Sequence, residues 1–159
     1  MKVGIGIDAH RFSRDRKLIL GGIEIPYEMG LDGHSDADVL THAVIDSILG
    51  ALGKGDIGRI FPDSEERYRG IYSIKLLEKV KDMFSFNIIN LDTVIICQKP
   101  KLSNYMDSMV EKISRALGIE KCKVSVKATT TEYMGFTGRG EGICAVAIVL
   151  LEDMNSNEK

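Results

Sequence analysis

Residues 124–151 read VSVKATTTEYMGFTGRGEGICAVAIVLL, which is a pair of strand-like segments joined by a connection rich in glycine and threonine. Residues 124–128 alternate apolar and polar side chains, and residues 143–151 form an almost continuous apolar run. Alternation is typical of a strand with one buried face, and a short apolar run bounded by glycine is typical of a buried strand. These closing segments predict a sheet at the centre of the fold.

Further strands are expected upstream. Residues 2–7 alternate small and apolar side chains and end at Asp8-Ala9-His10, as a strand does when it delivers side chains to a site. Residues 91–97 are mostly apolar and stop before Lys99-Pro100-Lys101, so they predict a buried strand. Gly21-Gly22 separates short apolar segments and predicts a tight hairpin, which we expect to be an outlying extension.

Amphipathic helices are expected between the strands. Ser35 or Asp36 can cap the first of them, and residues 54–69, rich in glycine and charge, then form a loop. Gly118 is placed as the left-handed stop of the last helix. Apolar side chains recur at helical spacing over residues 39–49, 71–84 and 106–117.

These elements predict an α+β fold: a mixed four-stranded sheet covered by helices on one side, with a small β-hairpin extension. A length of 159 residues and a hydrophobic content of 44% fit a single domain over residues 1–159. The polar tail over residues 155–159 is expected to fray.

Charge and cysteine content exclude several classes of protein. The formal net charge of -2 lacks the broad positive field of a nucleic-acid binder. Residues 3–7 are too short for a signal peptide and no apolar run reaches the length of a membrane span, so we expect a cytoplasmic protein. Cys97, Cys122 and Cys144 lie in strand-like contexts, and we expect small buried side chains rather than disulfides or a zinc cluster.

The three histidines include a candidate metal site. Asp8 and His10 are two apart on a predicted strand and face the same side, while His42 lies on the following helix. Two imidazoles and a carboxylate suit zinc, manganese or cobalt with one open position. The alternative is that His10 ends a strand and His42 is a satisfied core histidine. Asp38 or Asp46, one turn to either side of His42, could hold its second ring nitrogen.

Two glycine-containing segments could contact a nucleotide. Residues 33–36, Gly-His-Ser-Asp, precede a helix, where free N–H groups favour phosphate and His34 could donate to it; an ordinary helix cap explains them equally well. Residues 53–58 could let backbone approach a ligand, with Asp56 accepting from a ribose hydroxyl. They match no Walker or Rossmann pattern, so this second indication is weak.

The connection over residues 127–142 concentrates groups that bind phosphate. Its threonine hydroxyls, exposed glycine amides and Arg139 could hold phosphate, and Glu132 could hold a cation. The alternative is a long connection between strands whose glycines serve only turns. The concentration of such groups favours a functional interpretation.

Taken together, these motifs resemble those of the 2-C-methyl-D-erythritol 2,4-cyclodiphosphate synthases over nearly the whole chain. The resemblance implies conversion of 4-CDP-2-C-methyl-D-erythritol 2-phosphate to the cyclic diphosphate plus CMP, a phosphorus–oxygen lyase reaction of the non-mevalonate route to isoprenoid precursors. The matching segments are residues 6–10, 33–38 with His42, 55–58 with 61–63, and 127–142.

The resemblance also implies roles for individual residues. A first metal, zinc or else manganese or cobalt, is expected at Asp8, His10 and His42, and a second, magnesium or manganese, between the phosphates near Glu132. His34 and Thr130, with Glu132, are implied to act on the reacting phosphates. The residues implied to bind substrate are Asp8, Ala9, His10, His34, Ser35, Asp56, Ile57, Gly58, Phe61, Pro62, Asp63, Ser64, Glu65, Cys97, Gln98, Lys99, Pro100, Lys101, Leu102, Ser103, Ala128, Thr129, Thr130, Thr131, Glu132, Phe136 and Arg139.

Members of that family are homotrimers with active sites between subunits, so the resemblance implies the same assembly. Ile5 or Ile7 would then line the threefold axis, with Phe136, Arg139 and Glu141 near one end. A ring of Arg139 side chains suggests the hypothesis that an isoprenoid diphosphate binds in the threefold cavity, provided that Arg139 is free of a full ion pair with Glu141.

The sequence departs from the family pattern at two positions. Glu65 stands where an aspartate is common, and Ile7 stands where an aromatic residue is frequent. Other functions remain open on the residues alone: a metal-dependent nucleotide phosphohydrolase, or a trimeric metal-binding protein without turnover. Formation of a cyclic diphosphate with CMP distinguishes the synthase from both.

Overall fold

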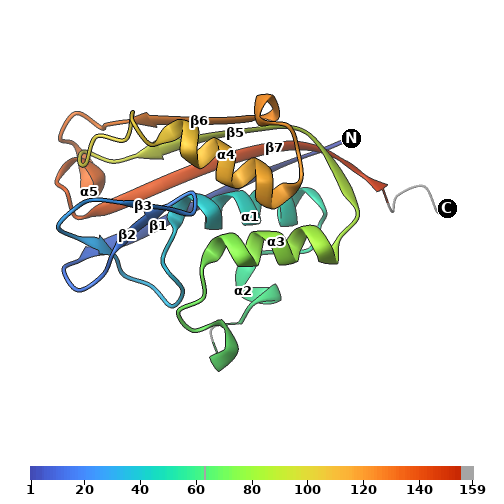
Figure 1. Cartoon of the computed structure of the whole chain (residues 1–159), viewed down its shortest axis with the longest axis horizontal. Helices are drawn as coiled ribbons and strands as arrows, with labels where there is room; N and C mark the ends of the chain where they lie inside the picture. Colours follow the sequence, from blue (N-terminus) through green and yellow to red (C-terminus); the bar gives the residue numbers. More distant parts are fainter. Residues whose placement is uncertain (63, 155–159) are drawn as a thin grey trace.

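A computed structural model describes residues 1–62 and 64–154, so the predictions for Asp63 and for the tail lie outside the described residues. At the centre of the fold is a five-stranded sheet in the order β4-β1-β7-β5-β6. Figure 1 shows its long strands β1, β7, β5 and β6 as one layer. Strands β5 and β6 are parallel and the other neighbours are antiparallel, so the sheet is mixed, as predicted. The strands are β1 (Lys2–Ser13), β4 (Gly30–Leu31), β5 (Phe86–Ile96), β6 (Val124–Thr129) and β7 (Gly142–Asp153).

The fifth strand corrects the predicted count of four. Strand β4 has two residues and pairs with Phe12 and Ser13, at the end of a β1 that runs beyond the expected segment. A two-residue strand carries no periodic pattern, because at least four residues are needed to show alternation.

Helices cover one face of this sheet, as predicted (Figure 1). Helix α1 is buried along nearly its whole length. Its cap is Asp38, which lies two residues after Asp36 and three after Ser35, so the predicted caps are wrong. Gly118 ends α4 with a φ of 65°, which confirms the left-handed stop. The helices are α1 (Val39–Ala51), α2 (Ile57–Ile60), α3 (Ser73–Met83), α4 (Met106–Leu117) and α5 (Gly135–Gly138), with the short 3₁₀ turns η1 (Glu66–Tyr68) and η2 (Lys121–Lys123).

Strand β1 and helix α1 touch backbone to backbone. A Cβ atom at Gly4 would lie 1.9 Å from the Ser47 carbonyl oxygen, and one at Gly6 would lie 2.0 Å from that of Ala43. Only glycine permits this approach. The strand that carries Asp8 is therefore held at a fixed short distance from the helix that carries His42.

The hairpin of β2 (Leu18–Leu20) and β3 (Ile23–Ile25) belongs to the core, so the prediction of an outlying extension is wrong. Leu18, Leu20 and Ile25 are at most 2% exposed. The reason is the tight Gly21-Gly22 turn, which packs onto Met109 of α4 and donates both of its N–H groups to the Asp38 carboxylate.

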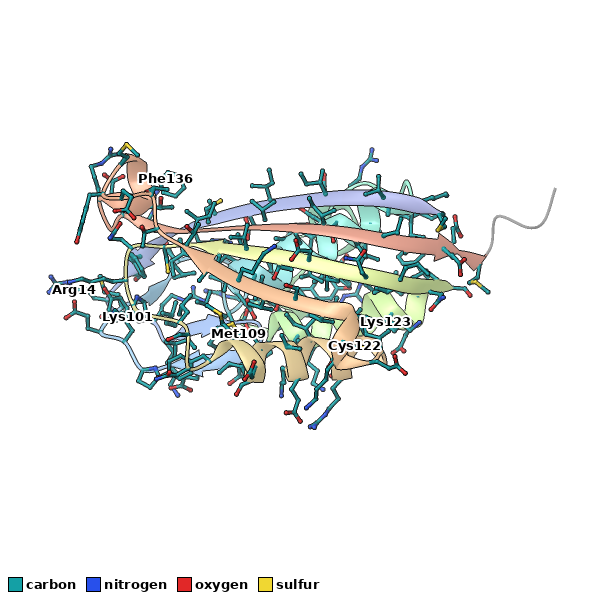
Figure 2. All side chains as sticks on the ribbon, turned by 90° about the horizontal axis from the view of Figure 1, so that it is seen from above. Arg14, Lys101, Met109, Cys122, Lys123 and Phe136 are labelled. Carbon is teal, nitrogen blue, oxygen red and sulfur yellow. The ribbon has the colours of Figure 1, made fainter. Side chains whose placement is uncertain are left out.

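Among residues 1–62 and 64–154, no helix covers the other face of the sheet. Figure 2 shows the outward side chains of β1, β7, β5 and β6 standing free on that face. Val3, Ile5 and Ile7 are 60% or more exposed, and Ile148 of β7 is 46% exposed. Such a row of exposed apolar side chains is typical of an interaction surface.

The cysteines are free thiols, as predicted, but they are not all buried. Cys97 is buried and Cys144 is partly buried, whereas Cys122 is exposed in the turn η2 after α4. Among the described helices, none has the length and apolar character needed to cross a membrane.

Candidate functional site

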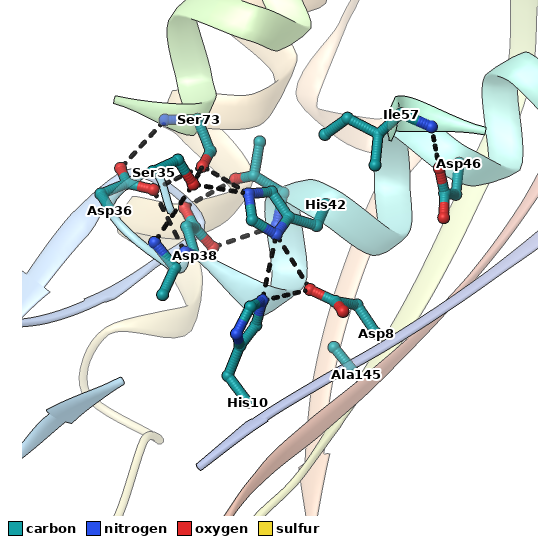
Figure 3. A network of polar contacts seen from close by, with 12 residues as sticks. Asp8, His10, Ser35, Asp36, Asp38, His42, Asp46, Ile57, Ser73 and Ala145 are labelled. Atoms are coloured by element: carbon teal, nitrogen blue, oxygen red, sulfur yellow. Dashed lines mark hydrogen bonds and ion pairs between the residues drawn. The ribbon is translucent and has the colours of Figure 1, made fainter. Parts of the chain in front are cut away.

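Asp8 and His10 on β1 meet His42 on α1, and this confirms the predicted convergence (Figure 3). The Asp8 Oδ2 atom lies 2.9 Å from His42 Nδ1 and 2.9 Å from His10 Nε2, and the two nitrogens are 3.4 Å apart. Alternation along β1 turns both of its side chains toward α1, and the glycine contact brings the helix within their reach.

These three donors fit a divalent cation. A tetrahedral zinc ion with bonds of about 2.0–2.1 Å separates its ligands by roughly 3.3 Å, close to the distances found here. His10 Nδ1 lies 2.6 Å from the Asp32 carbonyl oxygen, which can only accept, so Nδ1 carries the proton of a neutral ring. His10 Nε2 then presents a lone pair to the Asp8 carboxylate. Facing lone pairs require a cation between them, either a proton or a metal.

The electrostatics of the site agree with this requirement. Burial alone would raise the pKa of Asp8, but hydrogen bonds from His10 and His42 and their charges lower it well below its usual range. The hydrogen bond to Asp8 raises the pKa of His10, against the effect of burial. The lowered pKa of Asp8 and the raised pKa of His10 both reflect attraction between the Asp8 carboxylate and positive charge where the three donors meet.

The second nitrogen of His42 is not held by Asp38 or Asp46, so that prediction is wrong. His42 Nε2 lies 2.8 Å from Ser73 Oγ and 3.0 Å from Ser35 Oγ. Asp38 is fully buried as the cap of α1, and burial raises its pKa.

Asp46 fails as a partner of His42 for a similar reason. Its Oδ1 atom accepts the Ile57 N–H at 2.7 Å, and burial raises its pKa. Helical spacing shows which residues share a face, but it does not show which backbone groups compete for their oxygens.

A pocket opens beside the three donors. Tyr68 and Leu76, which the sequence did not single out, complete its wall, and Tyr68 packs edge-on against Phe61 with ring centroids 5.3 Å apart. The predicted substrate residues that line it are Asp8, His10, His34, Ser35, Ile57, Gly58 and Phe61.

Other predicted residues lie near this pocket without lining it. Asp56 uses Oδ1 to cap α2, accepting the Arg59 N–H at 3.0 Å, and Glu65 pairs with Arg67 at 2.5 Å. Ala9 faces the opposite side of β1 from the donors, because side chains alternate along a strand. Pro62 and Ser64 lie between Phe61 and Glu65 in the sequence, and neither residue lines the pocket.

A second pocket lies at the ends of β5 and β6. Met106 of α4 contributes to it, which the sequence analysis missed. Lys99 and Thr131 are not in its wall, and Glu132 is joined to it through Thr130 Oγ1, which donates to Glu132 Oε1 at 3.1 Å. The predicted residues that line it are Cys97, Gln98, Pro100, Lys101, Leu102, Ser103, Ala128, Thr129 and Thr130.

The two pockets are well separated within one chain. Strand register places Asp8 opposite Ala145, Ala145 opposite Ile95, and Ile95 opposite Ala128. Three strand spacings of about 4.8 Å put roughly 14 Å between Asp8 and Ala128. Within one chain, the three donors and Thr130 therefore lie in separate pockets.

The connection after β6 forms the short helix α5. Phe136 is 42% exposed there. Arg139 Nε donates to Glu141 Oε1 at 2.6 Å. The diphosphate hypothesis required Arg139 to be free of this ion pair, and in this chain that condition is not met.

Comparison with known proteins gives a consistent result. The model of the YgbB family matches residues 1–152. The 2-C-methyl-D-erythritol 2,4-cyclodiphosphate synthase of Desulforamulus reducens is 53% identical over 155 residues, covering 96% of this chain and 99% of its own length. That of Lachnospira eligens is 55% identical over 159 residues, covering 98% and 87%.

Solved structures agree in fold. The bifunctional IspDF of Campylobacter jejuni matches with a TM-score of 0.91 at 40% identity, over 96% of this chain and 42% of that longer one. The CDP complex of IspF from Plasmodium falciparum matches with a TM-score of 0.83 at 34% identity, over 96% of both chains.

Proposed function

Because the chain belongs to the YgbB family of 2-C-methyl-D-erythritol 2,4-cyclodiphosphate synthases, we propose that it converts 4-CDP-2-C-methyl-D-erythritol 2-phosphate to the cyclic diphosphate and CMP. The observation that carries this proposal is the convergence of Asp8, His10 and His42 beside a pocket that also contains His34.

In the proposed reaction, an oxygen of the 2-phosphate attacks the β-phosphorus of the CDP group. A new phosphorus–oxygen bond closes the ring, and the bond from the β-phosphorus to the CMP oxygen breaks, so that CMP leaves with that oxygen. The nucleophile is already an anion and needs no general base. Positioning and charge neutralisation carry most of the catalysis in such phosphoryl transfers.

The residues of this chain divide that task. Asp8, His10 and His42 would hold a zinc, manganese or cobalt ion, and Glu132 would help to hold magnesium or manganese between the phosphates. Such cations would neutralise charge that builds up on the phosphate oxygens. His34 lines the first pocket and would donate to a phosphate oxygen there.

We propose further that the first pocket of one copy meets the second pocket of a neighbour in a homotrimer. This proposal is supported by the roughly 14 Å that three strand spacings put between Asp8 and Ala128 within one chain, because a single copy would then hold the two groups of residues apart. The exposed apolar side chains of β1 supply a surface for self-association. Thr130 of one copy would then act opposite His34 of the next.

The proposed reaction is tested by its products. We expect phosphorus NMR of an incubation with substrate and a divalent cation to show a cyclic diphosphate together with CMP. Release of inorganic phosphate or a linear product would instead identify a phosphohydrolase, and metal binding without turnover would identify a metal-binding protein that is not an enzyme.

Asp56→Ala is expected to weaken CDP binding by about tenfold, the effect of one lost hydrogen bond, and to leave the zinc content unchanged. The variant Asp56→Asn keeps an oxygen that can cap α2. Calorimetry on both variants separates a contact to the ribose from the effect of the helix cap. Unchanged CDP affinity in Asp56→Ala contradicts the ribose contact. Weaker CDP binding in Asp56→Ala together with full affinity in Asp56→Asn assigns the effect to the helix cap.

Thr130→Ala is expected to lower kcat by on the order of 10²-fold with a smaller change in KM, because its hydroxyl would act where charge shifts between phosphates. Ser108→Ala, which removes an exposed hydroxyl on α4 that lines neither of the two pockets, serves as the control. A raised KM at normal kcat would make Thr130 a binding residue instead.

A further inference from the structure

A chain of buried polar groups leads away from the candidate metal site. His42 Nε2 lies 2.8 Å from Ser73 Oγ, at the first residue of α3. Ser73 Oγ donates to Asp36 Oδ1, and the Ser73 N–H donates to Asp36 Oδ2 at 3.0 Å. Ser73 is 0% exposed and Asp36 is 9% exposed, so water competes little with these bonds. Figure 3 shows the contacts from His42 to Ser73 and from Ser73 to Asp36.

The direction of each hydrogen bond follows from its acceptors. The Asp36 carboxylate only accepts, and it also takes the Asp38 N–H at 3.1 Å, so the single hydroxyl proton of Ser73 points to Asp36. Ser73 therefore turns a lone pair toward His42 Nε2. That nitrogen must carry the ring proton and donate it. In the neutral ring, Nδ1 is then unprotonated and faces Asp8, 2.9 Å away.

Ser35 does not change this result. Its hydroxyl lies 3.0 Å from His42 Nε2 and 3.2 Å from Ser73 Oγ, so it can donate to Ser73 while Ser73 accepts from His42. Ser35 Oγ also accepts the Ala37 N–H at 3.3 Å, which holds it in the loop before α1.

We propose that Asp36 and Ser73 are positioning residues for the metal site: the chain from Asp36 through Ser73 to His42 fixes the His42 tautomer that offers Nδ1 to the cation. The proposal rests on the metal centre of the proposed function. A ligand histidine whose other nitrogen donates to a carboxylate is common in metal sites, and here a serine hydroxyl lies between the two. His10 receives the equivalent support from the Asp32 backbone carbonyl, which no side-chain substitution removes.

The first test compares zinc affinities, measured by competition with a chromogenic chelator. Ser73→Ala is expected to weaken zinc binding by about 10- to 100-fold, as substitutions of such outer partners do. Its cobalt(II) absorption spectrum is expected to change as well, because the His42 ring loses its hydrogen-bonded orientation. The matched control is Ser47→Ala on α1, whose fully buried hydroxyl donates to the Val44 carbonyl oxygen away from the site. That variant is expected to bind zinc like the wild type.

The second test asks whether Asp36 acts through Ser73. As a single substitution, Asp36→Asn is expected to weaken zinc binding. Combined with Ser73→Ala, it is expected to cause little further loss of zinc affinity. If Asp36 had only a structural role, independent of Ser73, the fold-decreases in zinc affinity of the two single variants would multiply in the double variant. Melting of the metal-free variants shows how much stability each has lost, independently of zinc.

The outcomes separate the possible failures. A wild type that binds no zinc contradicts the proposed metal centre itself. Two results contradict only the positioning role, provided that the wild type binds zinc. In the first, Ser73→Ala binds zinc as tightly as the wild type. In the second, the decreases in zinc affinity caused by Asp36→Asn and Ser73→Ala multiply in the double variant. If Ser73→Ala does not fold, NMR of the zinc-loaded wild type tests the proposal instead. The His42 Nε2–H proton is expected to be protected from exchange with water. Exchange at the rate of free imidazole overturns the proposal.

Discussion

Replacement of His42 by alanine is expected to reduce turnover by at least about 10³-fold, the range seen when one positive group is removed from a phosphoryl-transfer site. The loss follows from geometry, because His42 provides one of only three donors that the described residues bring together. Two remaining ligands would bind a catalytic cation weakly. Steady-state assays with saturating zinc or manganese, combined with metal analysis of the purified protein, measure both effects.

The control for His42→Ala is Val44→Ala, on the same helix. Val44 is 0% exposed, so its truncation removes core packing without touching the donors. We expect Val44→Ala to melt at a lower temperature but to keep its metal and its turnover. Normal metal content and activity in His42→Ala would contradict the ligand assignment.

The second large effect is expected when two inactive variants are combined. His42→Ala damages the first pocket and Thr130→Ala the second, and each homo-oligomer is expected to be nearly inactive. When the two variants are co-expressed at equal levels and form mixed oligomers, each half of a site between neighbouring copies comes at random from either variant. About one quarter of such sites contain both intact halves, so we expect about one quarter of wild-type activity.

This complementation has clear contrary outcomes. If each site lay within one chain, every site would carry one defect, and mixing would restore nothing. Light scattering of the wild type at micromolar concentration is expected to give about three times the chain mass of 17.6 kDa, and a monomer would contradict shared sites.

Much of the candidate site could be predicted because local periodicity determines it. The period of two on β1 puts Asp8 and His10 on one face, and the apolar spacing after residue 38 identifies the helix that carries His42. The sequence does not contain the distance between that strand and that helix. The approach at Gly4 and Gly6 sets that distance, and it appears only when both elements are packed.

The partner of His42 could not be predicted for a related reason. Asp38 and Asp46 share its helix face, but backbone N–H groups from other parts of the chain occupy their oxygens. Ser73 is 31 residues away along the chain. A serine at the start of a predicted helix indicates a capping residue, not a contact to a histidine.

Fold details escaped prediction where the pattern is interrupted. Strand β5 starts at Phe86 instead of residue 91, because the register shift between Ile88 and Asn90 breaks the alternation. Helix α2 is a four-residue turn, too short for helical periodicity to show. The burial of the β2–β3 hairpin depends on the Asp38 carboxylate reaching the Gly21-Gly22 turn, a tertiary contact.

The pairing of β1 with β7 has a consequence for synthesis on the ribosome. Lys2 pairs with Leu151 and His10 with Ile143, so residues 2–11 of β1 pair with their partner strand only after β7 has been made. At roughly 5–20 residues per second, residues 142–153 begin to appear about 7 to 26 s after His10. For the later part of that interval, after His42 has been made, the nascent chain holds Asp8, His10 and His42 without the pairing of β1 with β7. The candidate metal centre is therefore completed after translation of β7, whatever the metal supply during synthesis.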